Sequence, residues 1–178
     1  MLEIEVKLRI ESSIAIKHLT ALGFNKECTV YEKDTYFNGE YIDLKKEDKA
    51  LRIRIHRNIE TGNTNFTLNF KGPKIDNVSM SREETEFEVP SYEQANSFLC
   101  GLGFHPAGEV EKNRTTYKKE DITCCIDNVT GLGEFLEIEI IAPEDKYEES
   151  MKRIEDILSS MELSINNTIR ESYLCMLS

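Results

Sequence analysis

Charged and apolar residues alternate without a break through the first ten residues of the chain. Glu3, Glu5, Lys7 and Arg9 fall on one face of an extended strand, and the residues between them are apolar. Paired carboxylates are typical ligands of divalent cations, and basic side chains bind phosphate oxygens. A lone strand of this kind is usually half buried with a solvated face, so the pattern indicates chemistry only if it recurs.

The same pattern recurs in strand after strand, each with one apolar face and one charged face. Asp34 shares a face with Tyr36, and Asn69 shares one with Lys71. The remaining charged faces carry Arg52 and Arg54, then Arg82, Glu84 and Glu86, then Lys112 and Arg114, then Asp127, Glu137 and Glu139.

Length and composition limit the classes of protein to consider. The chain has 178 residues, which predicts one domain over residues 1–178. Its formal net charge is −11 and its pI about 4.9, so nucleic acid and anionic membranes are poor candidate partners. The five cysteines are odd in number without a Cys-x-x-Cys pair, and no apolar run reaches membrane-spanning length. These features predict a cytoplasmic protein with reduced thiols.

Capping and turn signals divide the chain into its elements. Ser12 and Ser13 offer N-cap chemistry to the first helix, and Ser91 forms a capping box with Gln94 at the second. Helices are expected over residues 14–22, from Ser91, over 144–161 and from Thr168. Strands are expected over residues 1–10, 30–37, 51–55, 66–71, 82–89, 111–114, 121–129 and 136–140, with loops over 38–50 and 74–81.

The pattern of the chain recurs after Pro90, because residues 14–24 and 94–104 match at an offset of 80. Both stretches carry Ala, Leu, Leu, Gly and Phe at equivalent positions. Each follows a carboxylate-rich strand and precedes another charged strand. The order of elements therefore favours two duplicated halves of about four strands each.

About eight antiparallel strands can close into a barrel that holds side chains or one small ligand. If the charged faces pointed outward, the helices would have no apolar surface to cover, so we predict an α+β fold with a charged lumen and helices outside. Buried charges are costly unless they are paired or bind a ligand, and a polyanion with a divalent cation would satisfy both signs. The expected lumen contains Lys7, Arg9, Arg52, Arg54, Lys71, Arg82, Lys112 and Arg114 beside Glu3, Glu5, Glu84, Glu86, Asp127, Glu137 and Glu139.

These motifs, in this order, resemble the CYTH superfamily, the triphosphate tunnel metalloenzymes, which include class IV adenylyl cyclases and thiamine triphosphatases. The resemblance begins with Glu3-x-Glu5-x-Lys7 and extends over nearly the whole chain. Each motif is weak alone, but the ordered set is specific. The later motifs are Asp34-Thr-Tyr-Phe37, Ala50-Leu-Arg-Ile-Arg54, Phe70-Lys-Gly-Pro73, Arg82-x-Glu84-x-Glu86, Lys112-Asn-Arg114, Asp127 and Gly131-Leu-Gly-Glu-Phe-Leu-Glu-Ile-Glu139.

The resemblance implies an eight-stranded tunnel, a substrate that carries a triphosphate, and Mg²⁺ or Mn²⁺ as cofactor. It implies Lys7 and Asp127 as catalytic residues, and Asp34, Arg82, Glu84 and Glu86 as further candidates for the site. By the same likeness the metal ligands are Glu3, Glu5, Glu137 and Glu139, and the triphosphate-binding residues are Lys7, Arg52, Arg54, Lys71, Lys112 and Arg114.

The reaction stays open at the level of the sequence. The motifs of the chain most resemble those of class IV adenylyl cyclases, which implies conversion of ATP to cyclic AMP and pyrophosphate. The alternative is a phosphohydrolase that releases orthophosphate from thiamine triphosphate or inorganic tripolyphosphate. A module that binds a polyphosphate without turnover is a third hypothesis. The loops over residues 38–49 and 74–81 are where substrate selectivity is expected, and a homodimer is an open alternative.

Overall fold

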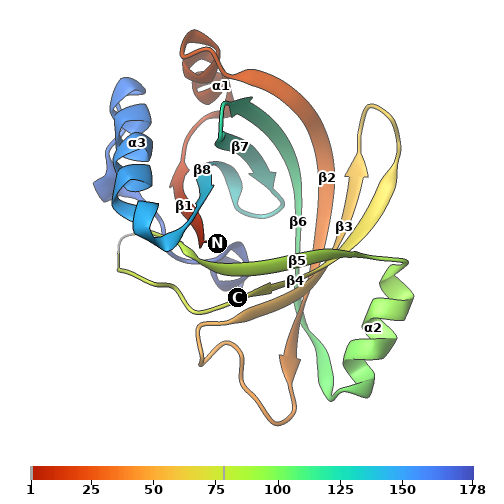
Figure 1. Ribbon diagram of the computed structural model, residues 1–178. Helices are drawn as coiled ribbons and strands as arrows, with labels where there is room; N and C mark the ends of the chain where they lie inside the picture. Colours follow the sequence, from red (N-terminus) through yellow and green to blue (C-terminus); the bar gives the residue numbers. More distant parts are fainter. Residues whose placement is uncertain (1, 78) are drawn as a thin grey trace.

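The computed structural model describes residues 2–77 and 79–178. Met1, at the start of the predicted first strand, and Val78, within the predicted loop over residues 74–81, lie outside the described residues. Eight strands form a closed antiparallel barrel, as predicted, and their order around it is β1-β5-β4-β3-β2-β6-β7-β8 (Figure 1). The strands are β1 (Leu2–Arg9), β2 (Asn25–Gly39), β3 (Ala50–Asn58), β4 (Thr64–Lys71), β5 (Arg82–Val89), β6 (Phe104–Lys119), β7 (Ile122–Val129) and β8 (Gly133–Ala142).

The barrel has the same neighbour relations when its two halves are exchanged. If β1 to β4 are renamed β5 to β8 and the reverse, every pair of neighbouring strands becomes a pair that also occurs in the barrel. The first strands of the two halves pair with each other, and so do the second strands. This topology agrees with the duplication expected from residues 14–24 and 94–104.

Helices cover the outside of the barrel, and the last short helix lies at its mouth. In Figure 1, α3 runs beside β1 and β8, and α2 lies at the opposite side of the barrel. The helices are α1 (Ser12–Ala21), α2 (Tyr92–Gly101), α3 (Tyr147–Ser160) and α4 (Tyr173–Met176), with short 3-10 turns at Glu144–Lys146 and Ile165–Asn167.

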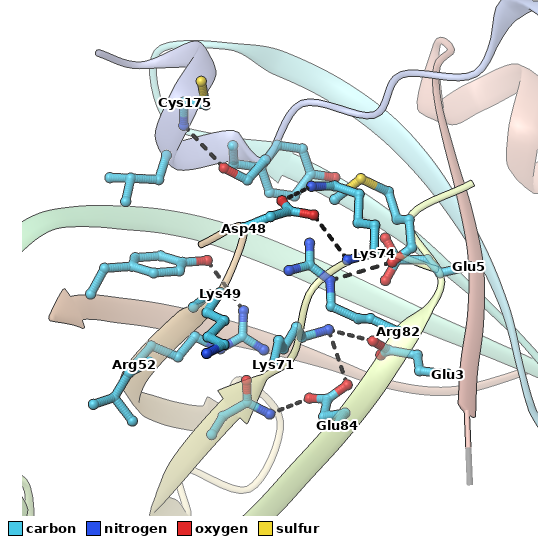
Figure 2. A pocket seen from close by; sticks show the side chains of 18 of the residues that line it. Glu3, Glu5, Asp48, Lys49, Arg52, Lys71, Lys74, Arg82, Glu84 and Cys175 are labelled. Atoms are coloured by element: carbon cyan, nitrogen blue, oxygen red, sulfur yellow. Dashed lines mark hydrogen bonds and ion pairs between the residues drawn. The ribbon is translucent and has the colours of Figure 1, made fainter. Parts of the chain in front are cut away.

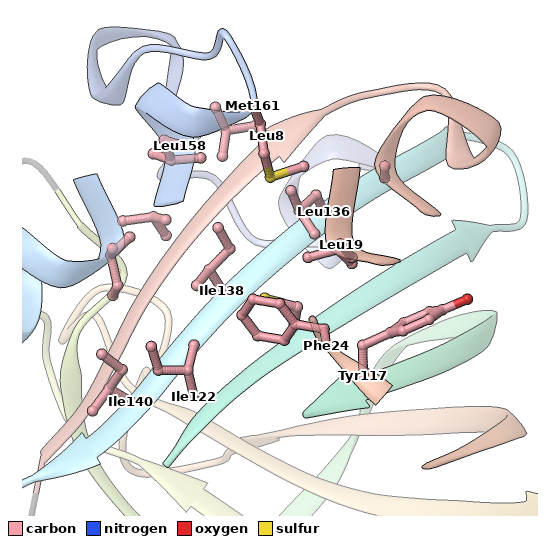
Figure 3. Packing of buried hydrophobic residues seen from close by; sticks show 14 of the residues in the cluster. Leu8, Leu19, Phe24, Tyr117, Ile122, Leu136, Ile138, Ile140, Leu158 and Met161 are labelled. Carbon is pink, nitrogen blue, oxygen red and sulfur yellow. The ribbon is translucent and has the colours of Figure 1, made fainter. Parts of the chain in front are cut away.

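The apolar faces of the strands point outward and form the core with these helices. Leu8 and Ile138 on the barrel meet Leu19 of α1 and Leu158 of α3, and all four side chains are almost fully buried (Figure 3). Full burial of such a side chain stabilises a fold by about 1.5–3 kcal/mol. The outward apolar faces therefore leave the charged faces of the same strands to line the interior.

The first helix is not capped as the sequence predicted. The helix begins at Ser12 instead of near Ile14, and its N-cap residue is Glu11, whose side chain makes no capping bond. The backbone N–H of Ser12 instead donates to the carboxylate of Glu134, 2.8 Å away, from the start of β8. A carboxylate distant in the sequence thus accepts the capping hydrogen bond that a local hydroxyl was expected to accept, and it lies at the positive end of the helix.

The last helix also begins later than the sequence predicted. It begins at Tyr173, where the hydroxyl of Ser172 accepts a bond from the N–H of Cys175, and Thr168 instead follows a 3-10 turn in an extended conformation. The second helix is capped as predicted, since the Ser91 hydroxyl accepts from the N–H of Gln94.

Two strands are much longer than predicted. β2 has 15 residues and β6 has 16, and these two strands pair with each other along their length. Their register shifts near Lys26 and again at Tyr36. Such shifts break strict alternation, which is why the pattern in the sequence ended early.

Candidate functional site

A cavity of about 760 Å³ opens inside the barrel and collects most of the predicted site residues. This volume is within the range of pockets that bind small molecules, roughly 300–1,000 Å³. Apolar groups such as Leu44 and Ile141 line other parts of its wall. The predicted residues that line it are Glu3, Glu5, Lys7, Arg52, Arg54, Lys71, Arg82, Glu84, Glu86, Lys112, Arg114, Glu137 and Glu139.

Three carboxylates converge in this cavity from two adjacent strands. Glu3 and Glu5 come from β1, and Glu139 comes from β8 directly opposite Glu5. Their nearest oxygens all lie within 4.8 Å of one another. Burial raises the pKa of Glu3 to about 8 and that of Glu139 to about 7, helped by the neighbouring carboxylates and opposed by the charge of Lys71. Buried carboxylates this close repel one another, and a divalent cation with oxygen ligands would relieve that repulsion.

Glu137, the fourth predicted metal ligand, has a different partner. Its carboxylate accepts a bond from the guanidinium of Arg114. Burial alone would raise the pKa of Glu137, but Arg114, Lys112 and Lys7 together hold it well below its usual range. The carboxylate is therefore neutralised by the protein itself, whereas those of Glu3, Glu5 and Glu139 meet one another.

Two arginines of β3 form the basic wall on one side of the cavity. Arg54 makes a bidentate pair with Asp34, with Nε to Oδ1 at 2.6 Å and Nη2 to Oδ2 at 2.8 Å. Arg52 reaches the same carboxylate at 3.2 Å and the hydroxyl of Tyr36 at 3.3 Å. Asp34 is buried behind these arginines and does not line the cavity. It holds the two cationic groups in a fixed orientation toward the lumen.

Asp127 does the same for the basic residues of β6. Its carboxylate accepts bonds from Lys112 at 2.9 Å and from Arg114 at 2.7 and 2.6 Å. Asp127 is fully buried and is separated from the cavity by the groups that it binds. This position suits a residue that orients the binding groups, and its predicted catalytic role stays a prediction.

Lys71 lies between two carboxylates at the edge of the cluster of three glutamates. Its ammonium is 2.5 Å from Glu3 and 3.0 Å from Glu84 (Figure 2). Asn69, directly beside it on the inner face of β4, donates to Glu84 and, at 3.2 Å, to Glu86. Lys71 therefore contacts the candidate metal-binding group and the β5 carboxylate of Glu84 at once.

Lys7 is buried in the middle of the site. Its ammonium donates to the carbonyl of Glu171 in the C-terminal segment and lies 4.4 Å from the centre of the Tyr173 ring. Burial lowers the pKa of Lys7 below its usual range. Among the described residues no carboxylate is bonded directly to this ammonium, so it is available to an anionic ligand.

Arg9 and Arg82, which the sequence predicted in the lumen, bond to backbone carbonyls instead of to the carboxylates described above. Arg9 is at the rim, where its guanidinium donates to the carbonyl of Leu132 at 2.7 Å and covers the ring of Phe135. Arg82 is buried and faces the carbonyls of Met80 and Gly72 at 3.4 and 3.3 Å. Arg82 lines the cavity from its own strand, but Arg9 does not line it.

A family model, described as the CYTH domain, matches residues 1–173 of the chain. The match covers all eight strands of the barrel and the C-terminal segment as far as Tyr173. The chain belongs to the CYTH family. The resemblance that the ordered sequence motifs carried is thereby confirmed.

Relatives of this CYTH protein agree with the assignment. A protein of Methanocaldococcus jannaschii named "Putative adenylate cyclase MJ0240" is 39% identical over 176 residues, which covers 98% of this chain and 97% of that protein. The PH1819 protein of Pyrococcus horikoshii shares the fold with a TM-score of 0.88 and 33% identity, over 98% of this chain and 97% of that one.

A second solved structure is similar in fold alone. It is a protein from Hippeastrum, at 22% identity and a TM-score of 0.66, over 91% of this chain and 88% of that one. Its description calls it a "putative adenylyl cyclase" that reveals a dominant triphosphatase activity.

Within residues 2–77 and 79–178 of the present CYTH protein, no helix has the length and apolar character needed to cross a bilayer.

Three residues of the CYTH barrel site were not singled out in the sequence. Glu32 is buried between Arg54, 3.1 Å away, and Lys112, 3.4 Å away. It has the same strand parity as Asp34, so the alternation could have revealed it. Asn69 was assigned to the charged face but not to the site. Tyr173 comes from the C-terminal segment, where no strand pattern exists to place it.

Proposed function

We propose that this CYTH protein is a cytoplasmic, divalent-metal-dependent enzyme that acts on a small-molecule triphosphate, with ATP cyclisation as the first candidate reaction. The observation that carries the proposal is the meeting of Glu3, Glu5 and Glu139 with a wall of arginines and lysines in one cavity. The five free cysteines are consistent with a reducing location.

The carboxylates fit Mg²⁺ or Mn²⁺, because both ions prefer oxygen ligands and three such groups lie within 4.8 Å. Glu3, Glu5 and Glu139 would hold the ion, and Glu137 would join them if it exchanged Arg114 for the cation. When bound, a divalent ion would neutralise charge on the phosphates and help to orient the nucleophile.

The triphosphate would lie along the basic residues of β1, β3, β4 and β6. Arg52 and Arg54 are preorganised by Asp34, and Lys112 and Arg114 by Asp127, so the donors face the lumen before the ligand arrives. Fixed donors of this kind bind phosphate oxygens without a cost of reorganisation. The proposed set is Lys7, Arg52, Arg54, Lys71, Lys112 and Arg114.

The position of attack distinguishes the two candidate reactions. A ribose 3′-hydroxyl that attacks the α-phosphorus in line forms cyclic AMP and expels pyrophosphate. Water that attacks the γ-phosphorus releases orthophosphate. The name of the Methanocaldococcus relative supports the first reaction, and the description of the Hippeastrum protein supports the second.

Product analysis tests the proposal directly. The protein is incubated with ATP, thiamine triphosphate and tripolyphosphate, each with Mg²⁺ or Mn²⁺ and with a chelator as control. Cyclic AMP with equimolar pyrophosphate is the expected result. Orthophosphate without a cyclic nucleotide would assign the protein as a hydrolase, and metal-dependent binding without any product would leave a binding module.

A further inference from the structure

The C-terminal segment over residues 168–178 returns to the mouth of the barrel and is bound there along its length. The N–H of Ile169 donates to the carbonyl of Lys7 at 2.7 Å, and Arg170 donates to the carbonyls of Asp76 and Ser79 at 2.6 and 3.3 Å. The side chain of Leu174 packs where Gly108 leaves room for it. These contacts fix the backbone on both sides of Tyr173.

Tyr173 reaches from this segment into the basic part of the cavity. Its ring lies 4.4 Å from the Lys7 ammonium and 5.2 Å from the Lys112 ammonium, measured to the ring centre. Its hydroxyl donates to Oδ2 of Asp127 at 3.1 Å. The side chain is buried, and it packs edge to face on Phe135 with ring centres 4.9 Å apart.

An aromatic ring suits this place for an electrostatic reason. A carboxylate partner would hold a lysine but would also neutralise it, and a phosphate would then have to displace that partner. The face of a ring attracts an ammonium and leaves its positive charge available to an anion. This reasoning applies to Lys7, which is buried, so that the attraction acts with little screening by water, whereas Lys112 is also bonded to the carboxylate of Asp127.

The hydroxyl of Tyr173 bonds to Asp127, the carboxylate that holds Lys112 and Arg114. Oδ2 of Asp127 also accepts the bonds from Lys112 and from Nη2 of Arg114. Tyr173 therefore fixes the carboxylate whose orientation determines where those two cations point. One side chain therefore contacts two members of the proposed triphosphate site, Lys7 and Lys112, and the carboxylate that orients a third, Arg114.

We propose that Tyr173 is a positioning residue of the triphosphate site, so that the C-terminal segment completes the site of the barrel. The ring positions Lys7 and Lys112 for the phosphates, and the hydroxyl positions Asp127 and, through it, Lys112 and Arg114. This inference rests on the proposed function, because the residues that Tyr173 positions are those assigned to the triphosphate.

Two variants separate the two roles. Tyr173→Phe keeps the ring and removes the hydroxyl, so the Kd of Mg²⁺-tripolyphosphate should stay within about threefold while kcat falls about tenfold. Tyr173→Leu keeps an apolar side chain but removes the ring as well, so its Kd should be about tenfold higher than that of Tyr173→Phe. Calorimetry gives the Kd, and turnover of the substrate found by product analysis gives kcat and KM.

Phe135→Leu is the matched control. Phe135 packs against Tyr173 in the same apolar cluster but does not line the cavity. Its replacement should lower the Tm while leaving Kd and kcat near the native values. Equal changes of Kd and kcat in Phe135→Leu and Tyr173→Leu would overturn the positioning role, because packing alone would then account for both.

The native protein distinguishes this failure from failure of the proposed function. If the native chain binds no triphosphate at all, the triphosphate site itself is rejected. If the native chain binds and turns over a triphosphate, and both Tyr173 variants match it, only the role of Tyr173 is rejected. Tyr173→Phe preserves the packing, so the test does not depend on the folding of the leucine variant.

Discussion

Glu137 and Glu139 lie two residues apart on the inner face of β8, but their surroundings differ. Glu139 faces Glu3 and Glu5, and burial followed by the charge of Glu3 raises its pKa to about 7. Glu137 is held by Arg114. A carboxylate that repels its neighbours destabilises the metal-free fold, whereas a paired buried carboxylate stabilises it.

The two glutamates should therefore respond oppositely to replacement by glutamine. At pH 8 without metal, Glu139→Gln should raise the free energy of unfolding by about 1–3 kcal/mol, because a buried charge near like charges is removed. Glu137→Gln should lower it by about 1–3 kcal/mol, because Arg114 loses a partner. Urea melts with chelator measure both. The double variant should lose Mg²⁺- or Mn²⁺-dependent turnover; unchanged turnover would refute the metal assignment.

The raised pKa values of Glu3 and Glu139 predict a pH dependence of the metal-free protein. Both groups bind a proton more tightly in the folded state, where the pKa values are about 8 and 7, than at the ordinary value of 4.5. Their contribution to stability is thus present below pH 4.5 and is lost as the pH rises toward 8.

The Tm of the metal-free protein should therefore fall by about 3 °C or more between pH 5.5 and pH 8.5. Saturating Mn²⁺ should reverse this trend, since metal binding requires the deprotonated carboxylates. Calorimetric melts with chelator or with Mn²⁺ measure the two trends. A Glu3→Gln, Glu139→Gln double variant is the control and should show a flatter profile, and a Tm that rises with pH in the metal-free native protein would contradict the prediction.

Single residues of the site were predictable where strand alternation assigns them a face. Glu3, Arg52, Lys71 and Glu139 all line the cavity, as the two-residue period of a strand requires. Strand alternation predicts which face of the barrel a side chain lies on, but not which other side chain it bonds to. It could not tell that Glu137 pairs with Arg114 across strands, because partners depend on the register of the whole barrel.

At the scale of elements, the sequence predicted those that local signals specify. The Ser91 cap and the eight strands were visible, because capping chemistry and alternation act over a few residues. The Glu134 carboxylate at the start of α1 was not visible, because it lies 122 residues away in the sequence. The docking of the C-terminal segment escaped prediction for the same reason, since its contacts are set by the finished barrel.

Gly108 makes the docking of that segment testable without a change in any proposed binding residue. A Cβ atom at this position of β6 would meet Cδ1 of Leu174 at 2.6 Å. Gly108→Ala should therefore displace the end of the Leu174 side chain and weaken the docking of the segment by about 1 kcal/mol. Hydrogen exchange should become faster over residues 168–178, and triphosphate binding should weaken.

Gly101→Ala is the control for that experiment, because an added Cβ there meets no atom within 4 Å. In α2 this change should leave exchange of the C-terminal segment unaltered, and it should stabilise the helix slightly. Equal exchange in both variants would show that the segment does not depend on the contact between Leu174 and Gly108.

At the scale of the whole molecule, the lumen has a carboxylate side and a basic side. Glu3, Glu5 and Glu139 lie on the paired strands β1 and β8, while Arg52 and Arg54 lie on β3 and Lys112 and Arg114 on β6. Lys7 on β1 and Lys71 on β4 lie between these two sides. The barrel holds both sides at fixed separation, because its eight strands are bonded into a closed ring. Neither a cation nor a polyanion alone satisfies such a lumen.

Divalent metal and triphosphate should therefore bind with positive coupling. A cation on Glu3, Glu5 and Glu139 would neutralise the charges that oppose a polyanion, and the polyanion would in turn offer oxygens to the cation. Coupling of this kind is typically about 1–3 kcal/mol, and it must be equal in the two directions. Mn²⁺ should thus raise tripolyphosphate affinity by about tenfold or more, and tripolyphosphate should raise Mn²⁺ affinity by the same factor.

Titration calorimetry of each ligand with and without the other measures this coupling, after correction for the complex that Mn²⁺ and tripolyphosphate form in solution. Glu139→Gln provides the matched comparison, because it weakens the cation site and leaves Arg52, Arg54 and Lys112 in place. In that variant the coupling should fall toward zero while the affinity for tripolyphosphate without metal stays equal or rises, since one repelling charge is gone. Native coupling that survives this substitution would mean that the cation binds elsewhere in the lumen.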